Sequence, residues 1–193
     1  MAYKTIVSDL SDEELIEKVL QGETQLYAAI VGRYQQHVAN LCYKICGNRL
    51  QVEEVVQEVF VELYAALPRF KFKAKLSTYI YRITVNVISK ALGHESRITL
   101  PDEVASANLP SGENNVEQSI VKSEREQQLR KAIGTLKHEQ RTALVLYTFN
   151  DFSYQDIADV MQVSLAKVES LIFRAKKNLH QILTNESQKS KKE

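Results

Sequence analysis

The sequence is short of the residues that build disulfides, metal sites and membrane spans. Its 193 residues include only two cysteines, Cys42 and Cys46, four positions apart. One helical turn does not easily meet disulfide geometry and a metal site needs further ligands, so we interpret both as small buried hydrophobic residues. No apolar run approaches the length of a membrane span, and the N-terminal residues lack a signal-peptide core. These absences predict a cytoplasmic protein with no membrane span.

Catalytic signatures are also missing. The sequence contains no glycine-rich phosphate loop, no Ser/His/Asp arrangement and no cluster of metal ligands. We therefore expect a protein that is not an enzyme, with no catalytic residue, no metal and no cofactor.

Proline is scarce, with three residues, and its positions divide the chain. Two prolines lie in residues 98–116, which also hold three acidic residues and no lysine or arginine. This composition predicts a flexible acidic linker between an N-terminal domain, residues 1–97, and a C-terminal domain, residues 117–184. The polar residues 185–193 are expected to form a disordered tail.

The apolar residues recur every three to four positions, which predicts an all-α protein. Ser11 and Glu14 form a capping-box pattern before a first helix. Three more helices follow, of which the third ends at Pro68 and the fourth spans about 77–92, giving a four-helix N-terminal domain. In the C-terminal domain we expect helices at about 117–136 and 139–147, followed by a helix-turn-helix. Expected core positions in the N-terminal domain include Leu15, Leu20, Tyr34, Leu63, Tyr64, Ile80, Ile83, Val87 and Ala91.

The third predicted helix carries an acidic stripe, formed by Glu54, Glu58 and Glu62 with Glu53 and Gln57 beside them. Like charges four residues apart repel, and no lysine follows at the intervening spacing to offset them. An unbalanced acidic surface suits a basic surface on a protein partner better than it suits DNA. The alternative is a helix face that is merely solvated.

Residues 69–82 form an aromatic-basic segment, RFKFKAKLSTYIYR. Cations attract backbone phosphates and exposed aromatic rings stack on unpaired bases, so the segment is typical of binding to locally opened DNA. For Phe70 and for Tyr81, a position in the core fits the sequence as well as a position on the DNA-binding surface. The candidate DNA-binding residues here and on the helix that follows are Phe70, Lys71, Phe72, Lys73, Lys75, Tyr79, Arg82, Asn86 and Lys90.

Residues 153–183 have the layout of a helix-turn-helix, in which the second helix enters the DNA major groove. Ser153 and Ser164 are the expected N-caps of the two helices, and Gln162 occupies the turn where glycine would relieve left-handed strain. Counting 100° per residue places an apolar face and a basic face on opposite sides of the second helix. The candidate DNA-binding residues are Ser164, Lys167, Ser170, Phe173, Arg174 and Lys177.

Taken together, these segments resemble the extracytoplasmic-function sigma factors of bacterial RNA polymerase, over residues 11–183. The resemblance implies that Glu54, Gln57, Glu58, Phe60 and Glu62 bind the polymerase. It implies that the aromatic-basic segment melts and recognises the minus-ten promoter element, with Asn86 at a characteristic Asn position and Tyr79 in place of a usual tryptophan. Residues 141–179 are similar to the domain that recognises the minus-thirty-five element, although Lys167, Glu169 and Leu171 depart from its common pattern.

The implied partners are core RNA polymerase, through its beta-prime clamp helices and its beta subunit, promoter DNA and an anti-sigma factor. A different class, the stand-alone helix-turn-helix regulator, predicts tight specific DNA binding by the isolated protein. The sigma-factor hypothesis predicts weak binding alone and promoter-specific initiation only with core polymerase. An enzyme with a DNA-binding tail is the third class, and it lacks candidate catalytic residues.

Overall fold

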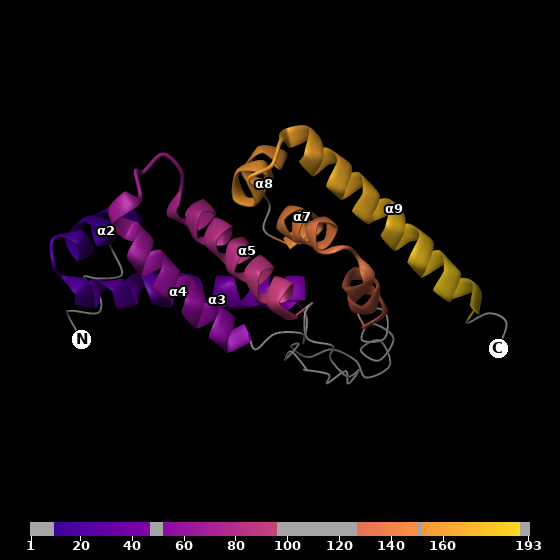
Figure 1. The fold of residues 1–193 in the computed structure, drawn as a ribbon, viewed down its shortest axis with the longest axis horizontal. Coiled ribbons are helices and arrows are strands. Elements are labelled where there is room, and N and C mark those ends of the chain that lie inside the picture. The colour runs from indigo at the N-terminus through magenta and orange to yellow at the C-terminus, as the bar shows by residue number, and fades with distance from the viewer. Residues whose placement is uncertain (1–9, 47–51, 96–126, 150–151, 190–193) are drawn as a thin grey trace. The chain divides into compact units, whose positions relative to one another are not determined.

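The computed structural model describes residues 10–46, 52–95, 127–149 and 152–189. The chain divides into two compact units, Met1–Pro101 and Asp102–Glu193. Within the described ranges every regular element is a helix, which confirms the all-α fold class (Figure 1). The boundary between the units falls inside the predicted linker, and residues 98–116 themselves lie outside the described residues.

The described part of the N-terminal unit consists of α-helices and two short 3-10 helices. The long helices α4 and α5 pack side by side, and α3 packs against both of them (Figure 1). Helix α2 packs on α3. Pro68 ends α4 as expected, because the chain passes directly into a 3-10 helix. The elements are α2 (Asp12–Leu20), η1 (Thr24–Leu26), α3 (Tyr27–Cys46), α4 (Val52–Ala66), η3 (Leu67–Arg69) and α5 (Leu76–Glu95).

The predicted capping box at the start of α2 is present. The Ser11 backbone N–H donates to Glu14 Oε2 at 2.6 Å, and the Glu14 backbone N–H donates to Ser11 Oγ at 3.1 Å. The hydrogen bonds from Ser11 lower the pKa of the Glu14 carboxyl below its ordinary value. Helix α2 is tied to α3 by Asp12, which pairs with Arg33 at 2.9 Å and accepts a hydrogen bond from the Tyr34 hydroxyl.

Most of the expected core positions are buried, but Leu20 and Tyr64 are exposed, and Tyr34 and Ala91 are half-buried. Leu15, Leu63 and Val87 are fully buried, whereas Leu20 is 47% exposed and Tyr64 is 45% exposed. Leu20 is the last residue of α2. Tyr64 packs one edge of its ring against Tyr27, at 5.0 Å between ring centroids, and leaves the other side in solvent.

The C-terminal unit has a helix over residues 127–135, followed by α7 (His138–Phe149), α8 (Tyr154–Met161) and α9 (Leu165–Lys189). Helix α9 packs against both α7 and α8. Its core includes Leu136, Leu144 and Ala175, with Leu179 packed against them. The predicted start of the first of these helices, at residues 117–126, lies outside the described residues.

The C-terminal end of α9 corrects one expectation. Residues 185–189, assigned to a disordered tail, continue the helix to Lys189. This stretch contains no proline or glycine, so nothing in it interrupts a helix that packing has already nucleated. The Thr184 hydroxyl donates to the His180 carbonyl oxygen at 2.7 Å, one turn earlier. Residues 190–193 lie outside the described residues.

Candidate polymerase and nucleic-acid interfaces

The acidic stripe lies on the solvent side of α4. Glu53, Glu54, Gln57 and Glu58 are exposed, and the opposite face of the helix buries a row that includes Val55, Val59 and Leu63. This division follows directly from the helical period, since residues three and four apart share a face.

Phe60 is the exception among the predicted polymerase-binding residues. It is only 7% exposed and lies in the core, not on the acidic stripe. Helix α4 packs against both α3 and α5, so its buried arc is wider than a single stripe and takes in Phe60 as well as Val59. The Tyr27 hydroxyl donates to the Phe60 carbonyl oxygen at 2.6 Å, which fixes α4 to α3.

The acidic stripe is offset at one end by a cation from a different helix. Lys90 of α5 pairs with Glu62 at 2.6 Å. This hydrogen bond raises the pKa of the Lys90 ammonium above its ordinary value, and the charge of Glu58 acts in the same direction. The spacing of residues within α4 could not predict this ion pair, because Glu62 and Lys90 are 28 residues apart in the sequence. The predicted polymerase surface and the predicted DNA surface therefore meet at Glu62 and Lys90.

Two exposed apolar side chains also lie on α4. Val61 is 69% exposed and Tyr64 is 45% exposed. Val61 was not predicted to belong to any site, although its position three residues after Glu58 and seven after Glu54 places it on the face of the acidic stripe. Carboxylates beside exposed apolar side chains suit a protein partner, because such interfaces combine charge complementarity with buried apolar surface.

Three of the four aromatic residues of the aromatic-basic segment, Phe70, Phe72 and Tyr79, form one cluster. Phe70 is the centre, with its ring centroid 5.0 Å from that of Phe72 and 5.0 Å from that of Tyr79. The Arg82 guanidinium lies over the Tyr79 ring, 4.8 Å from the centroid. Phe72 is 42% exposed, so the cluster presents an aromatic surface to solvent. Tyr81 is 7% exposed and belongs to the core.

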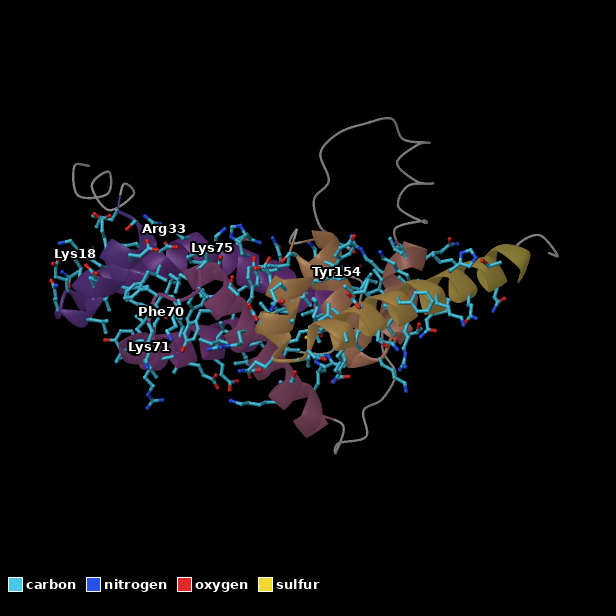
Figure 2. All side chains as sticks on the ribbon, turned by 90° about the horizontal axis from the view of Figure 1, so that it is seen from above. Lys18, Arg33, Phe70, Lys71, Lys75 and Tyr154 are labelled. Carbon is cyan, nitrogen blue, oxygen red and sulfur yellow. The ribbon has the colours of Figure 1, made fainter. Side chains whose placement is uncertain are left out.

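The lysines of this segment are exposed to solvent. Lys71, Lys73 and Lys75 are exposed on the connection between η3 and α5, as the labelled Phe70, Lys71 and Lys75 illustrate (Figure 2). Phe72 has a positive φ of 55°, which is uncommon for an aromatic residue and gives this connection a sharp bend. On α5, Asn86 and Lys90 are exposed one helical turn apart, on the face that begins with Tyr79 and Arg82.

The predicted helix-turn-helix is formed by α8, the turn at residues 162–164 and α9. Ser153 and Asp156 make a capping box at the start of α8. Gln162 has the left-handed φ of 54° and ψ of 46°, as its place in the turn predicted. Ser164 caps α9, accepting from the Lys167 backbone N–H at 3.3 Å.

The outer face of α9 carries most of the expected DNA-binding residues. Arg174 and Lys177 are exposed, Phe173 is 69% exposed, and Ser170 is half-buried. Lys167 is exposed but pairs with Glu139 of α7 at 2.7 Å. A second contact between the same helices is the hydrogen bond from Asn178 Nδ2 to Gln140 Oε1, at 3.2 Å, and these bonds orient α9 on α7.

One departure from the family pattern has a structural explanation. Leu171 is 7% exposed and packs in the core of the C-terminal unit, so the apolar residue matches its surroundings. Sequence analysis missed a cation-aromatic group on the same unit. The Lys176 ammonium lies 4.6 Å from the centroid of the Tyr147 ring, and that ring packs edge-on against Tyr154 at 5.4 Å.

The two cysteines are free and buried on α3. Burial raises the pKa of the Cys42 thiol to about 12, and Cys46 adds to the shift, so the thiol is protonated at neutral pH. In the part of the chain that the structure describes, no three His, Cys, Asp or Glu side chains are grouped as metal ligands would be. Nor is any described helix both long and apolar enough to cross a membrane.

Known proteins with similar sequences share both units. The family profile for Sigma-70 region 2 matches residues 30–98, and that for Sigma-70 region 4 matches residues 126–179. The chain is 31% identical over 175 residues to the ECF RNA polymerase sigma-E factor of Escherichia coli, covering 86% of this chain and 91% of that protein. It is 29% identical over 180 residues to the RNA polymerase sigma-H factor of Pseudomonas aeruginosa, covering 89% and 93%.

Solved structures show the same fold. The sigma factor RpoE of Bartonella quintana, in complex with the anti-sigma factor NepR, matches with a TM-score of 0.67 and 18% identity, covering 82% of this chain and 96% of that chain. CnrH, in complex with the cytosolic domain of CnrY, matches with a TM-score of 0.64 and 20% identity, covering 89% and 96%. The chain belongs to the extracytoplasmic-function sigma factors of the sigma-70 family, the RNA polymerase subunits that direct promoter-specific transcription.

Proposed function

We propose that the acidic stripe of α4 holds core RNA polymerase, through the beta-prime clamp helices. Glu53, Glu54 and Glu58 are exposed and make no ion pair with any described residue, so their charge is available to a basic partner. Val61 and Tyr64 supply apolar contact area beside them. Phe60 acts indirectly, by seating α4 in the core. The beta subunit is the second polymerase contact that we expect.

The aromatic cluster then captures a base of the minus-ten element as the strands part. Stacking is worth about 1–3 kcal/mol per base, enough to favour an unpaired base over a base in a duplex that has opened locally. Because Phe70 and Arg82 pack on Tyr79, the cluster is ordered before DNA arrives, and little entropy is lost on binding. Lys71, Lys73 and Lys75 attract the phosphates of the opened strand, and Asn86 has the amide that recognises a base edge.

Helix α9 binds the minus-thirty-five element as duplex DNA. Its N-terminus is capped and its exposed side carries Phe173, Arg174 and Lys177, which fits docking in the major groove. The side chains near the start of the helix face base edges, and the cations farther along contact phosphates. Binding energy alone drives strand opening, and the chain has no catalytic role of its own. It acts in the bacterial cytoplasm, where its polymerase and promoters are.

The observation that carries this proposal is the pair between Glu62 and Lys90. It joins α4 to α5 within one packed unit, where the acidic stripe meets the proposed DNA-binding row of α5, which we define as Tyr79, Arg82, Asn86 and Lys90. Polymerase binding on one side therefore fixes the position of the aromatic cluster on the other. We also propose an anti-sigma factor as a regulator, because the acidic stripe with Val61 and Tyr64 offers a large surface that such a partner would cover.

In vitro transcription with core polymerase and a library of genomic promoters tests the proposal. We expect the protein to redirect initiation to a defined set of start sites, and to bind the same promoters only weakly without polymerase. A stand-alone regulator would bind its sites tightly alone and leave the start sites of core polymerase unchanged. If initiation sites never change on addition of the protein, the proposal is wrong.

A further inference from the structure

Two rows of side chains run along the outer face of α9. Leu165, Glu169 and Phe173 follow one another at intervals of four residues, so they lie along one side of the helix. Leu165 is 43% exposed, Phe173 is 69% exposed, and Glu169 between them is exposed. The second row, Ser170 with Arg174 and Lys177, lies on the other side of the outer face. The second row contains the cations Arg174 and Lys177, which phosphates attract.

The position of Glu169 places it among the residues that face DNA bases. It is the fifth residue of α9, counted from Leu165, and α9 begins directly after the turn of the helix-turn-helix. In this motif the N-terminal residues of the second helix contact base edges in the major groove. Lys167, in the same turn, is held toward α7 by its ion pair with Glu139.

Glu169 differs from the neighbouring carboxylates in its contacts. Asp156 accepts hydrogen bonds from Ser153, and Asp159 accepts one from Gln155 at 3.2 Å. Glu169 makes no hydrogen bond or ion pair with another side chain in the described ranges. A carboxylate between two exposed apolar residues weakens general attraction to DNA, so its value lies in selecting a base.

We infer that Glu169 selects a cytosine in the upstream promoter element, by accepting a hydrogen bond from the cytosine N4 amino group. This inference rests on the proposed binding of α9 to the minus-thirty-five element. A carboxylate only accepts hydrogen bonds, and in the major groove cytosine presents a donor. Guanine presents acceptors at O6 and N7, and thymine presents an acceptor at O4. Both bases therefore repel the Glu169 carboxylate. Adenine offers a donor at N6 but an acceptor at N7 beside it, which opposes the second carboxylate oxygen.

A promoter library randomised across the upstream element tests the inference. Holoenzyme assembled from core polymerase and the full chain transcribes the library, and the transcripts are sequenced. We expect cytosine to be enriched about fivefold or more at one upstream position. Glu169→Gln should replace that preference with adenine, because glutamine pairs with N6 and N7 of adenine. Glu169→Arg should replace it with guanine, through O6 and N7.

The matched control is Asp159→Asn, which removes one exposed carboxylate from α8. It should change transcription of all library members equally and leave every base preference as it was. A companion library randomised across the downstream element should give the same base preferences with every variant, which shows that each variant is folded and bound to polymerase. The inference is overturned if wild-type protein selects other upstream bases but no cytosine, or if both Glu169 variants keep the cytosine preference. Absence of any upstream preference in the wild type would instead overturn the proposed binding of α9 to that element.

Discussion

The two units differ in which surfaces their interhelical ion pairs connect. In the N-terminal unit the acidic stripe and the DNA-binding row occupy neighbouring helices, and they meet at the 2.6 Å pair of Glu62 and Lys90. In the C-terminal unit the pair of Lys167 and Glu139 lies between α9 and α7, and its effect is to hold one helix on another. We therefore propose that the N-terminal unit binds polymerase and DNA at once, and that the outer face of α9 in the C-terminal unit binds DNA. Aromatic surface distinguishes them as well, because the N-terminal cluster suits unpaired bases and α9 suits duplex DNA.

The largest expected effects come from the cores, and they test whether the units are independent. Leu63 is fully buried in the N-terminal unit and Ile172 is 1% exposed in the C-terminal unit. Leu63→Ala and Ile172→Ala should each lower the free energy of unfolding of their own unit by about 2–5 kcal/mol, because each leaves a cavity. Urea unfolding followed by hydrogen exchange separates the two units. A loss of protection in both units from either substitution would contradict their independence.

Reversal of charge on the acidic stripe should separate the two partners of the N-terminal unit. Glu58→Lys should weaken the affinity for core polymerase by at least about tenfold, since like charges across an interface cost several kcal/mol. Helicity should be unchanged, because Glu58 is exposed. Co-purification with polymerase measures the effect. Glu17→Lys, an equal change on the exposed side of α2, is the control, and equal losses in both variants would contradict the assignment of the stripe.

Loss of the Tyr79 ring should affect strand opening more than polymerase binding. Tyr79→Ala should reduce open-complex formation by the stacking energy of one base, about 1–3 kcal/mol, whereas Tyr79→Phe keeps the ring and should retain most of it. A fluorescent base analogue in the minus-ten element reports opening. Thermal melting of both variants checks that the cluster of Phe70, Tyr79 and Arg82 has not unfolded locally. If the alanine variant opens the promoter normally, Tyr79 does not stack on a base of the minus-ten element.

A smaller effect should distinguish phosphate contacts on α9 from its base contacts. Lys177→Ala should weaken promoter binding equally on all sequences, and the slope of log affinity against log salt concentration should fall in magnitude by about 1. Lys131→Ala, at an exposed position on the helix over 127–135, is the control. Titration of holoenzyme binding at several salt concentrations measures the slope. An unchanged slope would exclude Lys177 from the phosphate contacts.

The smallest expected effect concerns pH and the C-terminal unit alone. Burial lowers the pKa of His138 below its ordinary value of 6.5, and the charge of Arg141 adds to the shift. The unfolded chain therefore binds this proton more tightly, so stability is present above pH 6.5 and is lost as the pH falls through the folded-state pKa. We expect the Tm of the C-terminal unit to fall as the pH is lowered below 6.5. In His138→Gln the fall should be smaller, and an identical fall would exclude His138 as its source.

Much of the fold was predictable because it depends on local rules. Apolar spacing predicted the helices, Ser11 and Ser153 predicted two capping boxes, and Gln162 predicted a left-handed turn. These features involve residues within a few positions of one another, so the sequence contains both partners side by side. The prediction that depended on composition instead of on a local contact was wrong. The tail composition predicted disorder, but α9 continues through residues 185–189.

The candidate sites were predictable as segments but not as sets of contacts. Phe60 fitted a binding motif by position, yet two packing neighbours of α4 place it in the core. The sequence did not decide whether Tyr81 is a core residue or a surface residue, and the structure places it in the core. Periodicity alone does not say how wide the buried arc of a helix is, because that depends on how many helices cover it.

The pattern of neighbouring residues in the sequence was sufficient to predict the helices, their caps and the order of the two sigma regions. It also predicted which helix faces carry acidic, aromatic and basic residues. Packing between helices was needed to pair Lys90 with Glu62, to hold Lys167 on Glu139, to gather Phe70, Phe72 and Tyr79 into one cluster and to leave Glu169 free of such contacts. The physical reason is distance in sequence. A helix brings together residues three or four apart, whereas each of the two ion pairs joins residues 28 apart and forms only once the helices have packed.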